Sequence, residues 1–127
     1  MMAKILSEAK VSYIKWDMNR SITECYSVAL PADRQGEVFH RYILGVYDLY
    51  ERLTSEFPEV LFESCSSGGG RFDPGMLYYA PQGWTSDDSD AIERLKIQYG
   101  TSLCYPISSM GSHVDRKSTR LNSSHVA

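Results

Sequence analysis

The chain has 127 residues, of which 43% are hydrophobic and 23% charged, and its formal net charge is −3. This composition is typical of a globular protein and excludes a low-complexity polymer or a wholly disordered chain. The length allows one domain of average size but excludes a complete (β/α)8 barrel, which needs roughly 200 residues or more.

The sequence has no feature that indicates a nucleic-acid or membrane partner. Its basic residues form no run interleaved with aromatics, which nucleic-acid binding favours. Its apolar runs are shorter than the ~18 residues of a membrane span, and its first ten residues lack the apolar core of a signal peptide. Three widely spaced cysteines, Cys25, Cys65 and Cys104, are typical of a reducing compartment. We therefore expect a cytoplasmic protein.

The first half of the chain predicts a helix, a strand and a second, longer helix. Residues 2–9 favour the end of a helix, and residues 11–16, rich in β-branched and aromatic side chains, favour a strand. From Glu37 to Phe57 apolar residues fall at helical spacing, which predicts one amphipathic helix ending before Pro58. Its apolar stripe consists of Phe39, Ile43, Val46, Tyr50, Leu53 and Phe57.

The second half predicts shorter elements separated by loops. Residues 60–63 favour a strand that runs into a loop of Ser, Cys and Gly at 64–70. A further loop, which contains Pro74, Gly75, Pro81 and Gly83, leads to a short third strand at 84–86, and residues 103–107 favour a fourth.

One helix is predicted between the third and fourth strands. Asp90 is its expected N-cap, with Glu93 as the capping-box partner, and Gly100 is expected to end it. The expected buried stripe of this helix consists of Ile92, Leu95 and Tyr99.

Alternating strands and helices predict an α/β fold with a parallel sheet. In such sheets the functional side chains lie at the carboxyl ends of the strands, where this chain carries Asp17, the loop at 64–70, and Asp87 with Asp88. We expect residues 1–114 to form one folded unit. Residues 115–127 are polar and without periodicity, and they predict a non-native or disordered tail that resembles translated sequencing-adapter read-through.

Two strand-end aspartates are the candidates for nucleophilic or acid–base chemistry. Asp17 follows the first strand, and Lys15 on the same side of that strand would hold it ionised. A surface salt bridge at a strand end is the alternative. Asp87 directly follows the third strand; together with Asp88 and Asp90 it also resembles half of a Ca²⁺-binding loop, but the remaining ligands of such a loop are missing.

Aromatic and small residues surround both aspartates. Trp16 and Trp84 flank them, as aromatic walls flank acids in sugar sites, although core packing is the alternative for each tryptophan. The loop at 66–71 matches neither the P-loop nor the GxGxxG spacing. It indicates either a tight turn with positive φ or a place where backbone approaches a ligand, with Cys65 on the rim. Paired carboxylates without a metal or cofactor signature favour glycoside hydrolysis.

Several motifs resemble glycoside hydrolase family 36, the microbial α-galactosidases, and occur in the same order. The longest are KWDMNR at 15–20, CSSGGGRFD at 65–73 and WTSDDSDA at 84–91. Shorter ones lie at 34–37, 40–42, 44–49, 97–102 and 109–114, so the resemblance covers residues 1–114.

The resemblance implies a role for each matched residue. Asp17 would be the nucleophile and Asp87 the general acid/base of a retaining mechanism, with the two carboxyl groups about 5–5.5 Å apart. The residues implied to line the galactose pocket are Lys15, Trp16, Asn19, Cys65, Gly68 and Trp84. No metal or organic cofactor is implied.

The resemblance also implies a fold and a substrate. The chain would form part of a (β/α)8 TIM barrel, roughly strands 4 to 7 of the catalytic domain, in a homo-oligomeric parent enzyme. That enzyme would remove terminal α-galactosyl residues from oligosaccharides such as melibiose or raffinose. The alternatives are an α-N-acetylgalactosaminidase, a galactosyltransferase of the raffinose-synthase type, or an inactive structural fragment, since part of a barrel leaves sheet edges unpaired.

Overall fold

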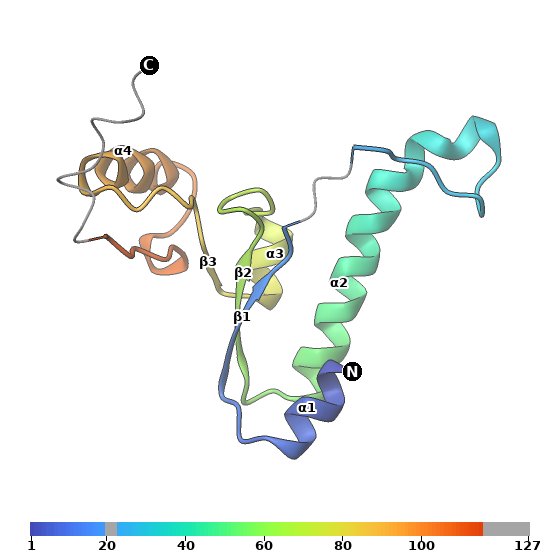
Figure 1. Cartoon of the computed structure of the whole chain (residues 1–127), viewed down its shortest axis with the longest axis horizontal. Helices are drawn as coiled ribbons and strands as arrows, with labels where there is room; N and C mark the ends of the chain where they lie inside the picture. Colours follow the sequence, from blue (N-terminus) through green and yellow to red (C-terminus); the bar gives the residue numbers. More distant parts are fainter. Residues whose placement is uncertain (20–22, 116–127) are drawn as a thin grey trace.

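The computed structural model describes residues 1–19 and 23–115, in which helices and short parallel strands alternate (Figure 1). The elements in chain order are α1 Met2–Glu8, β1 Tyr13–Asp17, the 3-10 helix η1 Ala32–Glu37, α2 Val38–Glu56, β2 Leu61–Cys65, α3 Pro74–Tyr79, β3 Gln82–Gly83, α4 Ala91–Ser102 and the 3-10 helix η2 Ile107–Ser109. No helix in the described ranges is long and apolar enough to cross a membrane. The predicted tail lies outside the described residues except for Asp115, whose backbone N–H donates to the Ser89 carbonyl at 2.9 Å.

The three strands form a parallel sheet in the order β1-β2-β3, which confirms the predicted α/β class. Asp17, at the end of β1, is level with Cys65, at the end of β2. Gly83 pairs with Ser64, and a single bridge from Gly83 to Met110 continues the sheet by one position. The carboxyl ends of the strands therefore meet at one edge, as expected.

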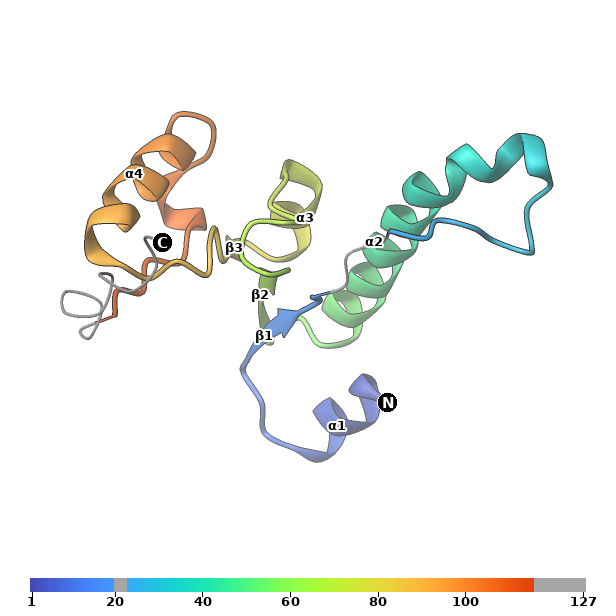
Figure 2. The ribbon, with the colours of Figure 1, turned by 45° about the horizontal axis from the view of Figure 1, so that its top comes forward.

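The two faces of the sheet differ in chemistry. On one face, Trp16 and Phe62 pack against Tyr50 of α2, with Trp16 and Tyr50 ring centroids 4.9 Å apart. On the other face lie Tyr13, Lys15, Asp17, Glu63 and Cys65, because side chains alternate along a strand. The helices α2 and α3 cover the apolar face, whereas α4 lies beyond β3 (Figures 1 and 2).

The predicted long helix is confirmed as α2, with its buried side at the expected spacing. Val46, Tyr50 and Leu53 are buried, and Phe57 just after the helix joins the same core. Phe39 at the start of the stripe is instead 52% exposed, because the first turns of α2 extend past the end of the sheet (Figure 1).

Three expectations about short elements were wrong. Helix α3 was expected to be a loop, but Asp73 caps it through the Met76 N–H, and Pro74 occupies the first turn, where proline is tolerated. Strand β3 lies at 82–83 rather than 84–86. The Trp84 N–H donates the last hydrogen bond to β2, at the Ser64 carbonyl, and the chain then leaves the sheet. Residues 103–107 form no strand, since Pro106 begins the 3-10 helix η2.

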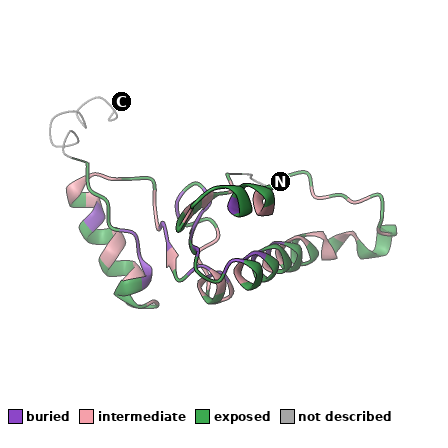
Figure 3. Ribbon diagram, turned by 90° about the horizontal axis from the view of Figure 1, so that it is seen from below, coloured by how far each residue is buried: buried purple, intermediate pink, exposed green. Residues whose placement is uncertain are grey.

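Helix α4 is predicted correctly in position and wrongly in its buried face. Asp90 caps it as expected, but its own N–H bonds Asp88 Oδ1 and Glu93 pairs with Lys96, so the capping box does not form. The helix also passes Gly100 and ends at Ser102. The expected buried stripe of Ile92, Leu95 and Tyr99 is 66–72% exposed, and Arg94 is the buried residue. No described element covers the stripe, and the other residues of α4 except Arg94 are exposed or of intermediate exposure (Figure 3).

Candidate active site

The nucleophile candidate lies where β1 and β2 end side by side. Asp17 Oδ2 accepts a hydrogen bond from Asn19 Nδ2 at 2.8 Å. Asn19 Oδ1 in turn accepts one from the Ser67 N–H at 2.7 Å, so the exit of β1 is tied to the loop that follows β2. The carboxylate itself is exposed and accessible to a substrate.

Hydrogen bonds keep this carboxylate ionised. The Asn19 bond is the largest cause that lowers the pKa of Asp17, followed by a hydrogen bond from the Cys65 thiol, while the charge of Lys15 contributes least. Burial raises the pKa of Cys65, so the thiol keeps its proton and can donate it. The prediction that Asp17 is held ionised is thus supported, but the main cause is Asn19 rather than Lys15.

Lys15 lies between strand β2 and Trp84, the residue that contacts the second aspartate. Its Nζ is 3.4 Å from Glu63 Oε1 on β2 and 4.5 Å from the ring centroid of Trp84. Glu63 is 2% exposed, and Tyr13 donates a hydrogen bond to its other oxygen. Burial raises the pKa of Glu63. Sequence reasoning missed Glu63, although a carboxylate within a predicted apolar strand is a signal that could have found it.

The acid/base candidate is held by the residue that precedes its loop. Trp84 Nε1 donates to Asp87 Oδ1 at 3.0 Å. Trp84 is only 7% exposed, and two cations lie close to its ring, with Arg94 Cζ 4.4 Å and Lys15 Nζ 4.5 Å from its centroid. His113 packs on it at 5.1 Å. Trp84 therefore supports Asp87 more than it presents an open aromatic wall.

The loop after β2 connects the two aspartates. Ser67 and Gly68 have positive φ angles of 46° and 78°, which confirms the predicted tight turn. A Cβ on Gly68 would lie 2.6 Å from Ser86 Cα and 2.8 Å from the Asp87 nitrogen. Only glycine lets the two backbone segments come this close. The loop that is hydrogen-bonded to Asn19, next to Asp17, therefore also contacts the backbone at Asp87.

Some predicted residues do not join this group. Trp16 points to the opposite face of β1, where it packs on Tyr50, so it belongs to the core here. Asp90 serves as a helix cap. Within residues 1–19 and 23–115, no group of three or more His, Cys, Asp or Glu side chains could hold a metal ion.

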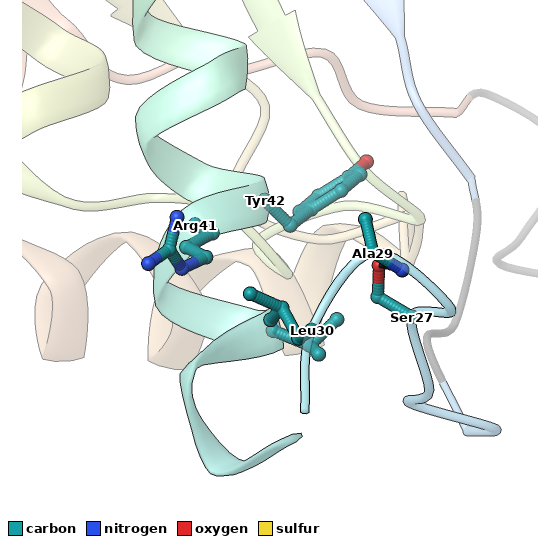
Figure 4. A pocket seen from close by; sticks show the side chains of 6 residues that line it. Ser27, Ala29, Leu30, Arg41 and Tyr42 are labelled. Carbon is teal, nitrogen blue, oxygen red and sulfur yellow. Dashed lines mark hydrogen bonds between the residues drawn. The ribbon is translucent and has the colours of Figure 1, made fainter. Parts of the chain in front are cut away.

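An open cavity lies at the N-terminal end of α2, outside the candidate site (Figure 4). Its volume is about 380 Å³, and it is lined by Ser27, Ala29, Leu30, Val38, Arg41 and Tyr42. Arg41 there is paired with Glu37 at 2.8 Å. The cavity includes none of the residues predicted to act on a sugar.

Comparison with known proteins gives consistent matches. The Melibiase family model matches residues 1–125. The chain is 64% identical over 112 residues to alpha-galactosidase AgaA of Geobacillus stearothermophilus, covering 88% of this chain and 15% of that enzyme. Two crystal structures of AgaA variants also match. One, with raffinose, has a TM-score of 0.86 at 58% identity, covering 94% of this chain and 17% of that chain. The other, with stachyose, has a TM-score of 0.82 at 62% identity, covering 88% and 16%.

Proposed function

Because the chain belongs to the melibiase family, we propose that it is the part of a retaining α-galactosidase that carries both catalytic carboxylates. It spans about 15% of the length of the relatives it matches, so the activity belongs to a longer enzyme. The observation that carries the proposal is the pair of aspartates, Asp17 at the end of β1 and Asp87 in the loop after β3, which the loop after β2 connects.

The relatives support the same pair. The two AgaA variants crystallised with stachyose and raffinose each have a different aspartate replaced, and those aspartates are 70 positions apart. Asp17 and Asp87 are separated by the same 70 positions. Replacing a catalytic carboxylate is a way to keep a substrate uncleaved, so the equal spacing favours these two residues.

In the first chemical step, Asp17 attacks the anomeric carbon while the glycosidic oxygen leaves. The bond from carbon to the Asp17 oxygen forms as the old C–O bond breaks, and Asp87 delivers its proton to the leaving oxygen. Trp84 holds Asp87 through Oδ1, which leaves Oδ2 to carry that proton. The hydrogen bonds from Asn19 and Cys65 keep Asp17 in the ionised form that attack requires.

In the second step, Asp87 accepts a proton from water, and that water attacks the galactosyl–Asp17 ester. Two inversions restore the original α configuration. Lys15, Asn19, Cys65 and Gly68 lie on the same edge and are proposed to contact the sugar. Trp16 is left out of this set because it packs in the core.

The remaining features follow from the position of the chain within the enzyme. We place it at about strands 4 to 7 of a (β/α)8 barrel, with the polar face of the sheet toward the barrel interior. The three free cysteines favour a cytoplasmic location, and the parent enzyme is proposed to be a homo-oligomer. The isolated chain is expected to be inactive, since its sheet edges and the stripe on α4 are uncovered.

The test uses Asp17→Ala and Asp87→Ala in the full-length enzyme, with 4-nitrophenyl α-galactoside and azide. Azide should rescue Asp17→Ala by a single displacement that yields β-galactosyl azide. It should rescue Asp87→Ala through the covalent intermediate, which yields α-galactosyl azide. Full activity of either variant, or the same anomer from both, would refute the assignment. Assays on the matching N-acetyl-α-galactosaminide and on sucrose as galactosyl acceptor test the alternative specificities.

A further inference from the structure

Arg94 is a buried cation that the proposed mechanism does not use. It is 2% exposed, on the side of α4 that faces the loop at 84–88, whereas Ile92, Leu95 and Tyr99 of the same helix are exposed. Removing a guanidinium from water is costly unless its donors are satisfied. Its location therefore needs a physical explanation, and the hydrogen bonds of Nη1 and Nη2 provide one, whereas Nε is buried without a hydrogen-bond partner among the described residues.

The hydrogen bonds of Arg94 enclose Asp87. Nη1 donates to the Ser86 carbonyl at 3.0 Å and to the Asp88 carbonyl at 3.2 Å, which are the residues on either side of Asp87. Two carbonyls held by one nitrogen fix the direction in which the intervening backbone presents its side chain. The contact is thus made to the backbone that carries the acid/base candidate.

A second contact reaches the carboxylate through the indole. Arg94 Cζ lies 4.4 Å from the ring centroid of Trp84, and Trp84 Nε1 donates to Asp87 Oδ1 at 3.0 Å. A guanidinium stacked on the ring limits its rotation and so fixes the direction of this N–H. The same arginine therefore restrains Asp87 at its backbone and at its carboxylate.

The other nitrogen anchors this arrangement to neighbouring elements. Nη2 donates to the Gly111 carbonyl and to Gln98 Oε1, both at 2.8 Å, and to Thr85 Oγ1 at 3.2 Å. A Cβ at Gly111 would lie 2.8 Å from the Trp84 ring, so the chain at 111 also packs against the indole. Lysine, with one nitrogen, could not reproduce this set of acceptors.

We propose that Arg94 is a positioning residue for the general acid/base, and that it sets the orientation of Asp87 through Trp84 and through the carbonyls on either side. The inference rests on the proposed function, because it assumes that Asp87 protonates the leaving oxygen. Its consequence is selective. In the first step, misplacing Asp87 slows substrates whose leaving group needs a proton and spares those whose leaving group departs as a stable anion.

The experiment compares Arg94→Met, Arg94→Lys and Asp87→Ala in the full-length enzyme on melibiose and on 4-nitrophenyl α-galactoside. For Arg94→Met we expect kcat/KM on melibiose, which reports the galactosylation step, to fall roughly 10²-fold, the effect of a displacement near 1 Å. The loss on the nitrophenyl substrate should be roughly tenfold smaller, because nitrophenolate leaves without protonation. Arg94→Lys keeps the charge and the aliphatic stem and should lie between wild type and Arg94→Met.

The matched control is Arg52→Met, which removes an arginine that is exposed on α2 and paired with Asp48. It should behave as wild type on both substrates. Wild-type turnover of melibiose by Arg94→Lys and Arg94→Met, or equal losses on both substrates in the folded Arg94→Lys enzyme, would overturn the proposal. If Asp87→Ala shows the leaving-group difference and the Arg94 variants do not, only this inference fails. If Asp87→Ala lacks it, the proposed function fails and this inference fails with it.

Discussion

Gly68→Ala should disable the site although it removes no functional group. The residue is buried with a φ of 78°, where a Cβ costs about 1–2 kcal/mol of stability. The new Cβ would lie 2.6 Å from Ser86 Cα, whereas ordinary contact begins at 3.4 Å. Because the obstacle is backbone, the segment carrying Asp87 must retreat by roughly 0.8 Å. A displacement near 1 Å can cost about 10²-fold in rate.

The assay is steady-state kinetics on melibiose together with chemical unfolding of the full-length enzyme. We expect kcat to fall by roughly 10- to 10²-fold in Gly68→Ala, because Asp87 is displaced relative to Asp17. Gly100→Ala is the matched control, since a Cβ there meets nothing within 4 Å. As a glycine inside α4, it should gain about 0.5–1 kcal/mol of stability with unchanged kinetics.

Two results would refute this reasoning about Gly68. Wild-type kcat in Gly68→Ala would show that the loop does not set the position of the Asp87 segment. A loss confined to KM would show that the methyl group meets the sugar rather than the backbone at Ser86.

Three further substitutions test single contacts. Asn19→Ala removes the largest cause of the lowered pKa of Asp17, so the acid limb of the kcat/KM profile should move to higher pH; an unmoved limb would contradict this. Asp90→Ala removes the cap of α4 and should cost about 1 kcal/mol in chemical unfolding, and a loss near zero would show that the cap is dispensable. Burial raises the pKa of Glu63, so its contribution to stability is lost as the pH rises through the folded-state pKa. Glu63→Gln should therefore gain stability relative to wild type as the pH rises above the usual glutamate pKa of about 4, and a constant difference in unfolding midpoint would argue against that burial effect.

Residue patterns predicted the parts of the fold that rest on local periodicity. Strands β1 and β2 and helix α2 lie within a few residues of their expected positions, because β-branched runs and a helical apolar stripe act over short distances. The same reasoning treated Pro74 and Gly75 as loop residues that break a helix, whereas they are the first residues of α3, directly after its N-cap Asp73. A breaker and a helix start share these residue types, and only the cap geometry distinguishes them.

Some residues of the candidate site could be predicted from the sequence and others could not. Asp17 and Asn19 are neighbours in sequence, and their hydrogen bond lies within reach of motif reasoning. Arg94 was missed because a cation between apolar residues on a helix ordinarily faces solvent. Periodicity finds the apolar side of α4 but not the element that packs against the helix. Here that element is a loop of carbonyl oxygens, which buries the arginine instead.

The two halves of the site are held by different kinds of structure. Asp17 is placed by the register of two five-residue strands, fixed from behind by a core that includes Phe62. Asp87 follows β3, which has only two residues and cannot hold a loop by register alone. Side chains must supply the missing constraint, and a guanidinium with several donors can bind many carbonyls at once. The shortness of β3 thus accounts for a buried Arg94 on α4, because the carbonyls that fix the acid/base loop offset the desolvation of its Nη1 and Nη2 groups, although Nε has no acceptor among the described residues.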